Sequence, residues 1–240
     1  MLAYALAAAV YAASVLFGIA GVVLLLPPWE NILVVLLGVS LLLMCLIARP
    51  TTAQPPYYLL SRSEYPVLHR LCDLIAQRMD SPLVDGIAIC ADFNANYRIA
   101  GWRRQRYIEL GSPLLAILSS KERVAILAHE LSHGANGDPL RGLLLFGSVN
   151  TLASWASAIR PTQIGAADDG LSKSPLGSHA SIMAIPFQLL MLATSEVIFW
   201  AMRAMHLLAL RQSQRAEYFA DRLAATVAGS KEMQGALEKT

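Results

Sequence analysis

The chain has 240 residues, of which 55% are hydrophobic and only 15% charged, and its mean hydropathy is +0.48. This composition excludes an ordinary soluble enzyme and favours an integral membrane protein. The net charge of +2 gives no case for a nucleic-acid partner. Three cysteines, an odd number without framework spacing, predict free thiols and a reducing compartment (Cys45, Cys72, Cys90).

Residues 1–49 are predicted to form a transmembrane hairpin. The first 26 residues contain no charged side chain and are long enough to cross a bilayer as a helix. A tight turn at 27–30 leads into a second uncharged stretch, 31–48. A cleaved signal peptide is the competing interpretation of the first stretch, but it would need a basic n-region and a shorter apolar run.

Basic residues set the expected orientation. Arg49, Arg62 and Arg70 follow the second apolar stretch, whereas the turn at 27–30 has no basic residue. The positive-inside rule then places the N-terminus and the segment after residue 49 in the cytoplasm. We therefore expect an integral membrane protein with a cytoplasmic domain.

The segment 50–139 is expected to be the first half of that domain. Apolar residues at helical spacing predict an amphipathic helix over 63–79, and 84–91 and 105–110 predict two strands. Gly111-Ser112-Pro113 then turns the chain into a short helix. The segment between the strands, 92–97, is either a turn, as its asparagines suggest, or an edge strand that pairs with an extended peptide.

The next predicted helix carries the most specific motif in the chain. Ser119 and Glu122 form a predicted capping box, and His129-Glu130-Leu131-Ser132-His133 matches the pattern H-E-x-x-H. On a helix, two histidines four residues apart share one face and can bind the same Zn²⁺, with Glu130 beside them to accept a proton from water. Gly134 is expected to end this helix. The alternative is two ordinary helix histidines beside a solvated glutamate.

Residues 140–211 are predicted to add two further membrane helices. The uncharged stretch 142–159 and the longer stretch 180–210 are the candidates, joined by a polar loop at 160–179 on the far side of the membrane. Glu196 and Arg203 interrupt the second stretch and could pair or line a wet groove. One or both stretches could instead be buried helices of the soluble domain.

A zinc site needs a third protein ligand, and the final segment, 212–240, supplies an acidic candidate. Glu217 and Asp221 lie four residues apart on one predicted helical face, so Glu217 can complete a His₂Glu site with His129 and His133. Asp221 can accept the free ring N–H of a ligand histidine. Ser230 is expected to cap one more helix that has no stop signal before Thr240, which suggests a truncated domain.

Several of these parts together resemble the family of membrane zinc endopeptidases that includes HtpX and the CAAX prenyl endopeptidases. The resemblance rests on the order of parts over most of the chain, from the N-terminal hairpin through Phe93-Asn94-Ala95, 108–115, 128–133 with Asn136-Gly137-Asp138, to 217–221. The family often has arginine three residues before the ligand glutamate, where this chain has Gln214.

The resemblance implies a mainly α-helical protein with about four membrane helices and a cytoplasmic α+β zinc-peptidase domain containing a small β-sheet. It implies one Zn²⁺ per chain, held by His129, His133 and Glu217, with Glu130 as general base and Asp221 supporting a ligand. Asn94 and Ala95 would lie on the edge that binds substrate.

The expected function is therefore endopeptidase activity on membrane proteins or peptides at the lipid bilayer, in membrane protein quality control under stress. Two alternatives remain, a sensor-transducer of the antibiotic-receptor type and a non-catalytic membrane scaffold. The first would need an external sensor domain.

Overall fold

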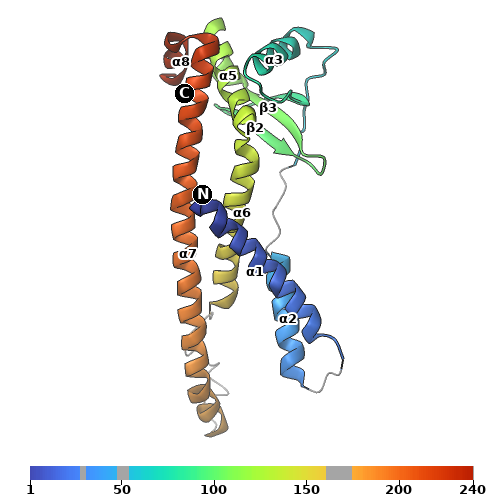
Figure 1. Ribbon diagram of the computed structural model, residues 1–240, viewed down its shortest axis with the longest axis vertical. Helices are drawn as coiled ribbons and strands as arrows, with labels where there is room; N and C mark the ends of the chain where they lie inside the picture. The colour runs from blue at the N-terminus through green and yellow to red at the C-terminus, as the bar shows by residue number, and fades with distance from the viewer. Residues whose placement is uncertain (28–30, 48–53, 161–174, 240) are drawn as a thin grey trace. The chain divides into compact units, whose positions relative to one another are not determined.

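The computed structural model of the protein describes residues 1–27, 31–47, 54–160 and 175–239, with the side chains of 175–184 left aside. The described chain is mainly helical with one small sheet, so the expected fold class is confirmed (Figure 1). Its contacts divide it into two compact units, residues 1–50 with 144–209, and residues 51–143 with 210–240. The turn at 28–30 and most of the 160–179 loop (161–174) lie outside the described residues.

The first unit contains a close-packed helix pair, α1 (Leu2–Leu24) and α2 (Ile32–Ile47). The two backbones meet at Gly21 and Gly38, where a Cβ on either glycine would lie 2.8–3.1 Å from the other's carbonyl oxygen. Large apolar side chains such as Leu33 (68% exposed) point away from the pair. Small residues inside and large apolar residues outside are typical of helices that face lipid.

The same unit includes parts of α6 (Asp138–Ile159) and α7 (Pro175–Ala228). Trp155 on α6 donates its indole N–H to the Met44 carbonyl at 2.9 Å, and its ring contacts Phe17 in a tilted arrangement. By length and apolarity, three described helices can cross a membrane, α1, α6 and the 185–228 part of α7, whereas α2 is a shorter apolar helix. The length and apolarity of these helices therefore support a membrane-bound protein.

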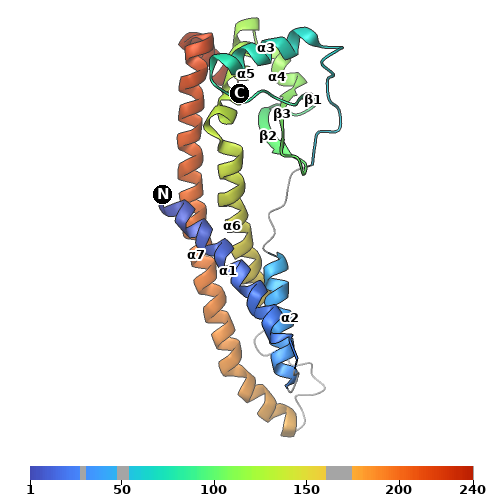
Figure 2. The ribbon, with the colours of Figure 1, turned by 45° about the vertical axis from the view of Figure 1, so that its right-hand side comes forward.

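The second unit is built on a three-stranded sheet of β1 (Gly86–Cys90), β2 (Ala95–Ala100) and β3 (Gln105–Gly111). The spatial order is β1-β3-β2, with β1 parallel and β2 antiparallel to the central strand (Figure 2). The two strands expected at 84–91 and 105–110 correspond to β1 and β3. For the segment 92–97 the sequence allows either a turn or an edge strand, and β2, which begins at Ala95, is an edge strand of the sheet.

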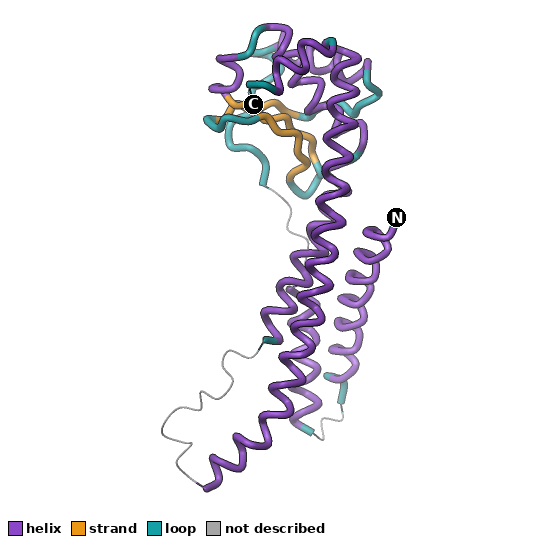
Figure 3. Tube along the Cα trace, turned by 90° about the vertical axis from the view of Figure 1, so that its left-hand side faces the viewer, coloured by secondary structure: helices purple, strands orange, loops and turns teal. Residues whose placement is uncertain are grey.

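Helices lie beside the sheet and complete the second unit, together with the end of α7 (Figure 3). They are α3 (Pro66–Arg78), α4 (Ser112–Ile117), α5 (Ser120–Asn136) and α8 (Ser230–Leu237). A shared core joins them to the sheet through fully buried residues such as Ile108, Leu131 and Ala224. Gly229, not Ser230, is the N-cap of α8.

Helix α5 begins as expected and ends later than expected. The capping box is present, because Ser119 accepts the Glu122 N–H and Glu122 accepts the Ser119 N–H at 2.7 Å. The helix continues through Gly134 to Asn136 and ends at Gly137, which has a left-handed φ of 71°. Gly134 serves packing instead, since a Cβ there would lie 2.8 Å from both Ser81 Oγ and the Tyr97 hydroxyl.

We therefore expect Gly134→Ala to destabilise the protein, although alanine is the better helix former. The intrinsic helix preference would contribute about 1 kcal/mol in favour of alanine, whereas overpacking a tight contact costs about 1–3 kcal/mol. The apparent thermal unfolding midpoint of the purified protein should fall. Gly137→Asn is the control, because no atom lies within 4 Å of that site and asparagine tolerates the left-handed conformation. Equal or higher stability of Gly134→Ala would contradict this account.

Candidate metal centre

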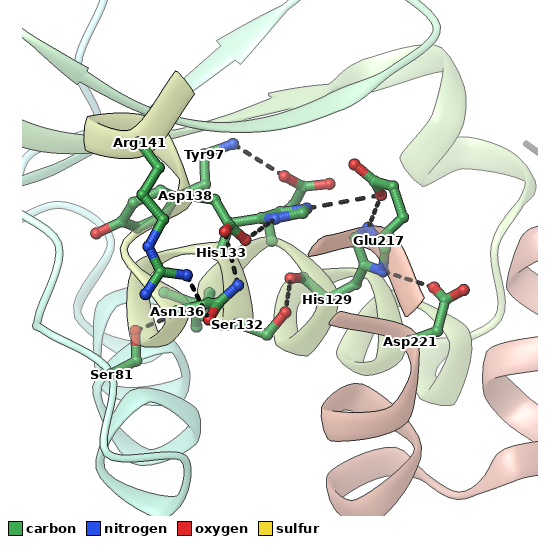
Figure 4. Close-up of polar contacts among 12 residues, drawn as sticks. Ser81, Tyr97, His129, Ser132, His133, Asn136, Asp138, Arg141, Glu217 and Asp221 are labelled. Atoms are coloured by element: carbon green, nitrogen blue, oxygen red, sulfur yellow. Dashed lines mark hydrogen bonds and ion pairs between the residues drawn. The ribbon is translucent and has the colours of Figure 1, made fainter. Parts of the chain in front are cut away.

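Two helices of the second unit bring three ligand-type side chains together. His129 and His133 project from one face of α5, and Glu217 projects from α7 (Figure 4). The Nε2 atoms of His129 and His133 lie 3.3 Å and 3.8 Å from Glu217 Oε2. One ligand atom from each residue lies within 4.8 Å of the others. The structure thus groups the three residues that the sequence singled out as metal ligands.

The distances fit a tetrahedral zinc ion. Zn–N and Zn–O bonds of about 2.0–2.2 Å place neighbouring ligand atoms of a tetrahedron roughly 3.3–3.6 Å apart, and the two measured separations from Glu217 are 3.3 and 3.8 Å. Three protein ligands leave the fourth position open for a reacting molecule, as catalytic zinc sites require. The donor set of two imidazoles and one carboxylate also suits zinc.

Each of the two histidines has a carboxylate near its Nδ1 atom. Asp221 Oδ1 lies 2.9 Å from His129 Nδ1, although the two atoms are not aligned as a hydrogen bond. Asp138 Oδ2 lies 3.0 Å from His133 Nδ1 and is aligned. A carboxylate on Nδ1 fixes the tautomer that leaves Nε2 free for a metal.

Sequence reasoning gave no role to Asp138. Its other oxygen accepts a hydrogen bond from Asn136 Nδ2 at 2.6 Å, and Arg141 donates to Asn136 Oδ1 at 3.1 Å. Asp138 can reach His133 because α5 ends at Gly137 and the next residue starts α6. The sequence shows that Asp138 follows His133 by five residues, but only the helix break at Gly137 brings the two side chains into contact.

Glu130 lies beside the two histidines and is almost completely buried, with 8% exposure. Its Oε2 accepts the backbone N–H of Tyr97 at 2.9 Å, which leaves Oε1 available. Burial raises the pKa of Glu130, while the two histidines and the Tyr97 N–H oppose that rise. A bound dication would add to the opposing effect and favour the ionised carboxylate.

The edge strand β2 runs past this carboxylate. Gly111 N–H donates to the Asn94 carbonyl, so the N–H groups of Ala95 and Tyr97 point away from β3. The Tyr97 N–H is bound by Glu130, and the Ala95 N–H by the Asn94 side chain at 2.9 Å. Asn94 and Ala95 therefore lie at the start of the free edge, two to three residues from the Glu130 contact.

The chain is similar to proteins of a known family. The family model described as "Peptidase family M48" matches residues 64–239. "Protease HtpX" of Tolumonas auensis is 29% identical over 158 residues, covering 64% of this chain and 50% of that protein. The proteins of the same name from Pseudomonas putida and Pseudomonas fluorescens are 29% and 30% identical over 157 residues, covering 64% of this chain and 48% of each relative. The chain spans about half the length of these curated relatives.

Proposed function

Because the chain belongs to peptidase family M48, we propose that it is a membrane-bound, zinc-dependent endopeptidase that uses one Zn²⁺ per chain. The observation that carries the proposal is the convergence of His129, His133 and Glu217 within 4.8 Å, with the carboxylate of Glu130 beside them. His129, His133 and Glu217 would hold the ion, and Asp221 and Asp138 would orient the two imidazoles.

Glu130 is the proposed general base and general acid. Zinc, when bound, polarises the scissile carbonyl and makes water acidic enough to react near neutral pH. Glu130 accepts the proton of the attacking water and later delivers it to the leaving amine, as a general base and then a general acid. Its burial excludes bulk water from the carboxylate, and the Tyr97 N–H holds one of its oxygens in place.

The substrate is proposed to bind as an extended strand along the free edge of β2. The N–H groups of Ala95 and Tyr97 are already bound within the protein, so their carbonyl groups, which lie on the same edge, would accept the N–H groups of the added strand. Asn94 at the start of the edge supplies a side-chain amide for the same peptide. Because this pairing uses main-chain groups, the site would select substrates for their extended conformation and much less for any particular side chain.

The active site is proposed to face the cytoplasm from the bacterial inner membrane. Arg49, Arg62 and Arg70 after the second apolar stretch support this orientation through the positive-inside rule. A membrane-bound site on that side suits substrates such as damaged or misassembled membrane proteins, which would give the protein a part in quality control.

The direct test is hydrolysis of an unstructured protein substrate by the purified full chain. Activity should disappear when a chelator removes the metal, because the proposed reaction needs the ion that His129, His133 and Glu217 would hold. It should return when Zn²⁺ is restored. Capture of membrane proteins in cells by an inactive variant would then test the substrate class. Activity that survives complete metal removal would refute the proposal.

Asp138 should contribute to metal affinity without touching the metal. Asp138→Ala removes the hydrogen bond to His133 Nδ1, and loss of such a partner lowers metal affinity about 10- to 100-fold. Competition with a zinc-binding dye measures the change. Arg141→Ala is the control one contact further away, and its effect should be much smaller. Equal affinity of Asp138→Ala and the unmodified protein would exclude this role.

A further inference from the structure

A short turn joins β2 to β3 (Figure 2). It contains a fully exposed tryptophan. Trp102 has 98% of its surface exposed, and Arg103 and Arg104 follow it. Gly101 and Arg104 both have left-handed φ angles, 73° and 51°, which close the turn and direct the residues between them outward. Arginine at such a position is conformationally less favourable than glycine or asparagine.

A second exposed aromatic segment lies against this turn. A Cβ on Gly101 would be 3.5 Å from Pro55 Cγ, so the segment that starts at Gln54 passes beside the turn. Tyr57 and Tyr58 follow, 94% and 76% exposed, with their rings 5.4 Å apart. The segment is fixed at its far end by the Leu60 N–H, which donates to the Ile87 carbonyl at 2.8 Å.

The charges of the turn are not neutralised within the described structure. Neighbouring charged groups are already engaged, since Arg98 pairs with Glu109 at 2.6 Å and Asp85 accepts the Arg106 backbone N–H. Among the described residues, no carboxylate forms an ion pair with Arg103 or Arg104. The patch made of Pro55, Tyr57, Tyr58, Trp102, Arg103 and Arg104 therefore combines exposed aromatic rings with two unpaired cations.

The covalent chain connects this aromatic–basic patch to the membrane helices. Helix α2 ends at Ile47, and the first residue of the patch segment, Gln54, follows seven residues later. Seven residues of extended chain reach at most about 25 Å. Gln54, the first residue of the patch segment, is therefore at most about 25 Å of chain from the end of the apolar helix α2.

We propose that the aromatic–basic patch docks on the interface of the bilayer that holds the apolar helices, with Trp102 and the tyrosines among the headgroups and Arg103 and Arg104 on anionic lipid phosphates. Tryptophan and tyrosine prefer the membrane–water interface because their rings are apolar and their N–H and O–H groups polar. Arginines beside an anionic leaflet add electrostatic attraction. The docked partner is lipid, and docking does not depend on peptidase activity.

The test uses the full chain, labelled with 5-fluorotryptophan, in lipid nanodiscs. Trp102→Phe identifies the Trp102 signal among the ¹⁹F resonances of the four tryptophans. Lipids with a headgroup nitroxide should broaden that signal, more in discs with phosphatidylglycerol than in pure phosphatidylcholine. Replacing Arg103 and Arg104 by glutamine should lower the ratio of docked to free patch about fivefold per arginine. Lys121→Gln, at an 80% exposed side chain of the same unit, should leave it unchanged.

Three results would overturn the proposal. Broadening of the Trp102 signal by a soluble paramagnetic reagent but not by the lipid nitroxide would show that the patch stays in water. Protection from both would indicate a protein partner or a second copy of the chain. Broadening by the lipid nitroxide that is the same with and without phosphatidylglycerol, and the same after both arginines are replaced, would show that anionic headgroups take no part in docking. Unchanged signals of the other tryptophans verify that each variant is folded.

Discussion

Glu130→Gln is expected to abolish peptide hydrolysis while the protein stays folded and keeps its metal. Glutamine has the size of glutamate and can accept the Tyr97 N–H through its amide oxygen, so the link between α5 and β2 survives. It cannot accept a proton from water, and loss of general acid–base catalysis costs about 10²–10⁴ in rate. The turnover number should fall by at least about 100-fold, whereas zinc content by elemental analysis should not change.

The control is a glutamate on the same helix that takes no part in the site. Glu122→Gln weakens the capping box and the ion pair with Lys239, 2.7 Å away, so it should lower stability but not the turnover number per folded molecule. Undiminished proteolysis by Glu130→Gln, or a zinc content that falls together with its activity, would contradict the role assigned to Glu130.

Glu217→Ala is expected to weaken metal binding more than Asp138→Ala or Glu130→Gln. The change removes one of three ligands, and the two histidines alone then face an ion that needs a third protein donor. Zinc affinity should fall by more than the roughly 10- to 100-fold typical of an outer hydrogen-bond partner, and activity should fall with it. Chelator competition and elemental analysis of the purified protein measure both.

Stability should change little in Glu217→Ala without metal. The Glu217 side chain is 53% exposed, and alanine favours the helix that carries it. Arg222→Ala, an exposed position on the same helix, is the matched control and should bind zinc normally. Full zinc occupancy of Glu217→Ala at low free zinc would mean that another side chain is the third ligand.

The sequence predicted those parts of the site that depend on local helical spacing. His129 and His133 are four residues apart, as are Glu217 and Asp221, and a helix alone places each pair on one face. Their meeting across 84 residues of sequence was inferred from zinc's need for a third ligand, and the structure brings them within 4.8 Å. Their roles remain predictions that the substitutions above test.

Features that depend on tertiary contacts were not predictable in the same way. Gly134 looked like a helix end, because glycine usually marks one, but Ser81 and Tyr97 pack on it and the helix continues. The sequence leaves 92–97 open between a turn and an edge strand, and the pairing of Ala95–Ala100 with β3 decides for the strand.

A longer-range difference concerns the segment that carries the third ligand. The predicted boundary near residue 211 falls inside a single helix, α7, which runs from Pro175 to Ala228. No helix-breaking residue separates the apolar stretch from the helical turn that carries Glu217. The residues between them, such as Gln212 and Gln214, are good helix formers. The contacts divide the two compact units between Ala209 and Leu210, close to the predicted boundary and within this continuous helix.

The hydrogen bond between Glu130 and the Tyr97 N–H has a kinetic consequence. One oxygen of the carboxylate is fastened to the strand proposed to receive the peptide, and the other is free for chemistry. A peptide that pairs poorly with β2 and twists it would also turn the proton acceptor away from its reacting partner. Such a peptide would bind and yet react slowly, so selectivity would be expressed in kcat rather than in KM. Discrimination between extended and folded chains would then occur at the chemical step.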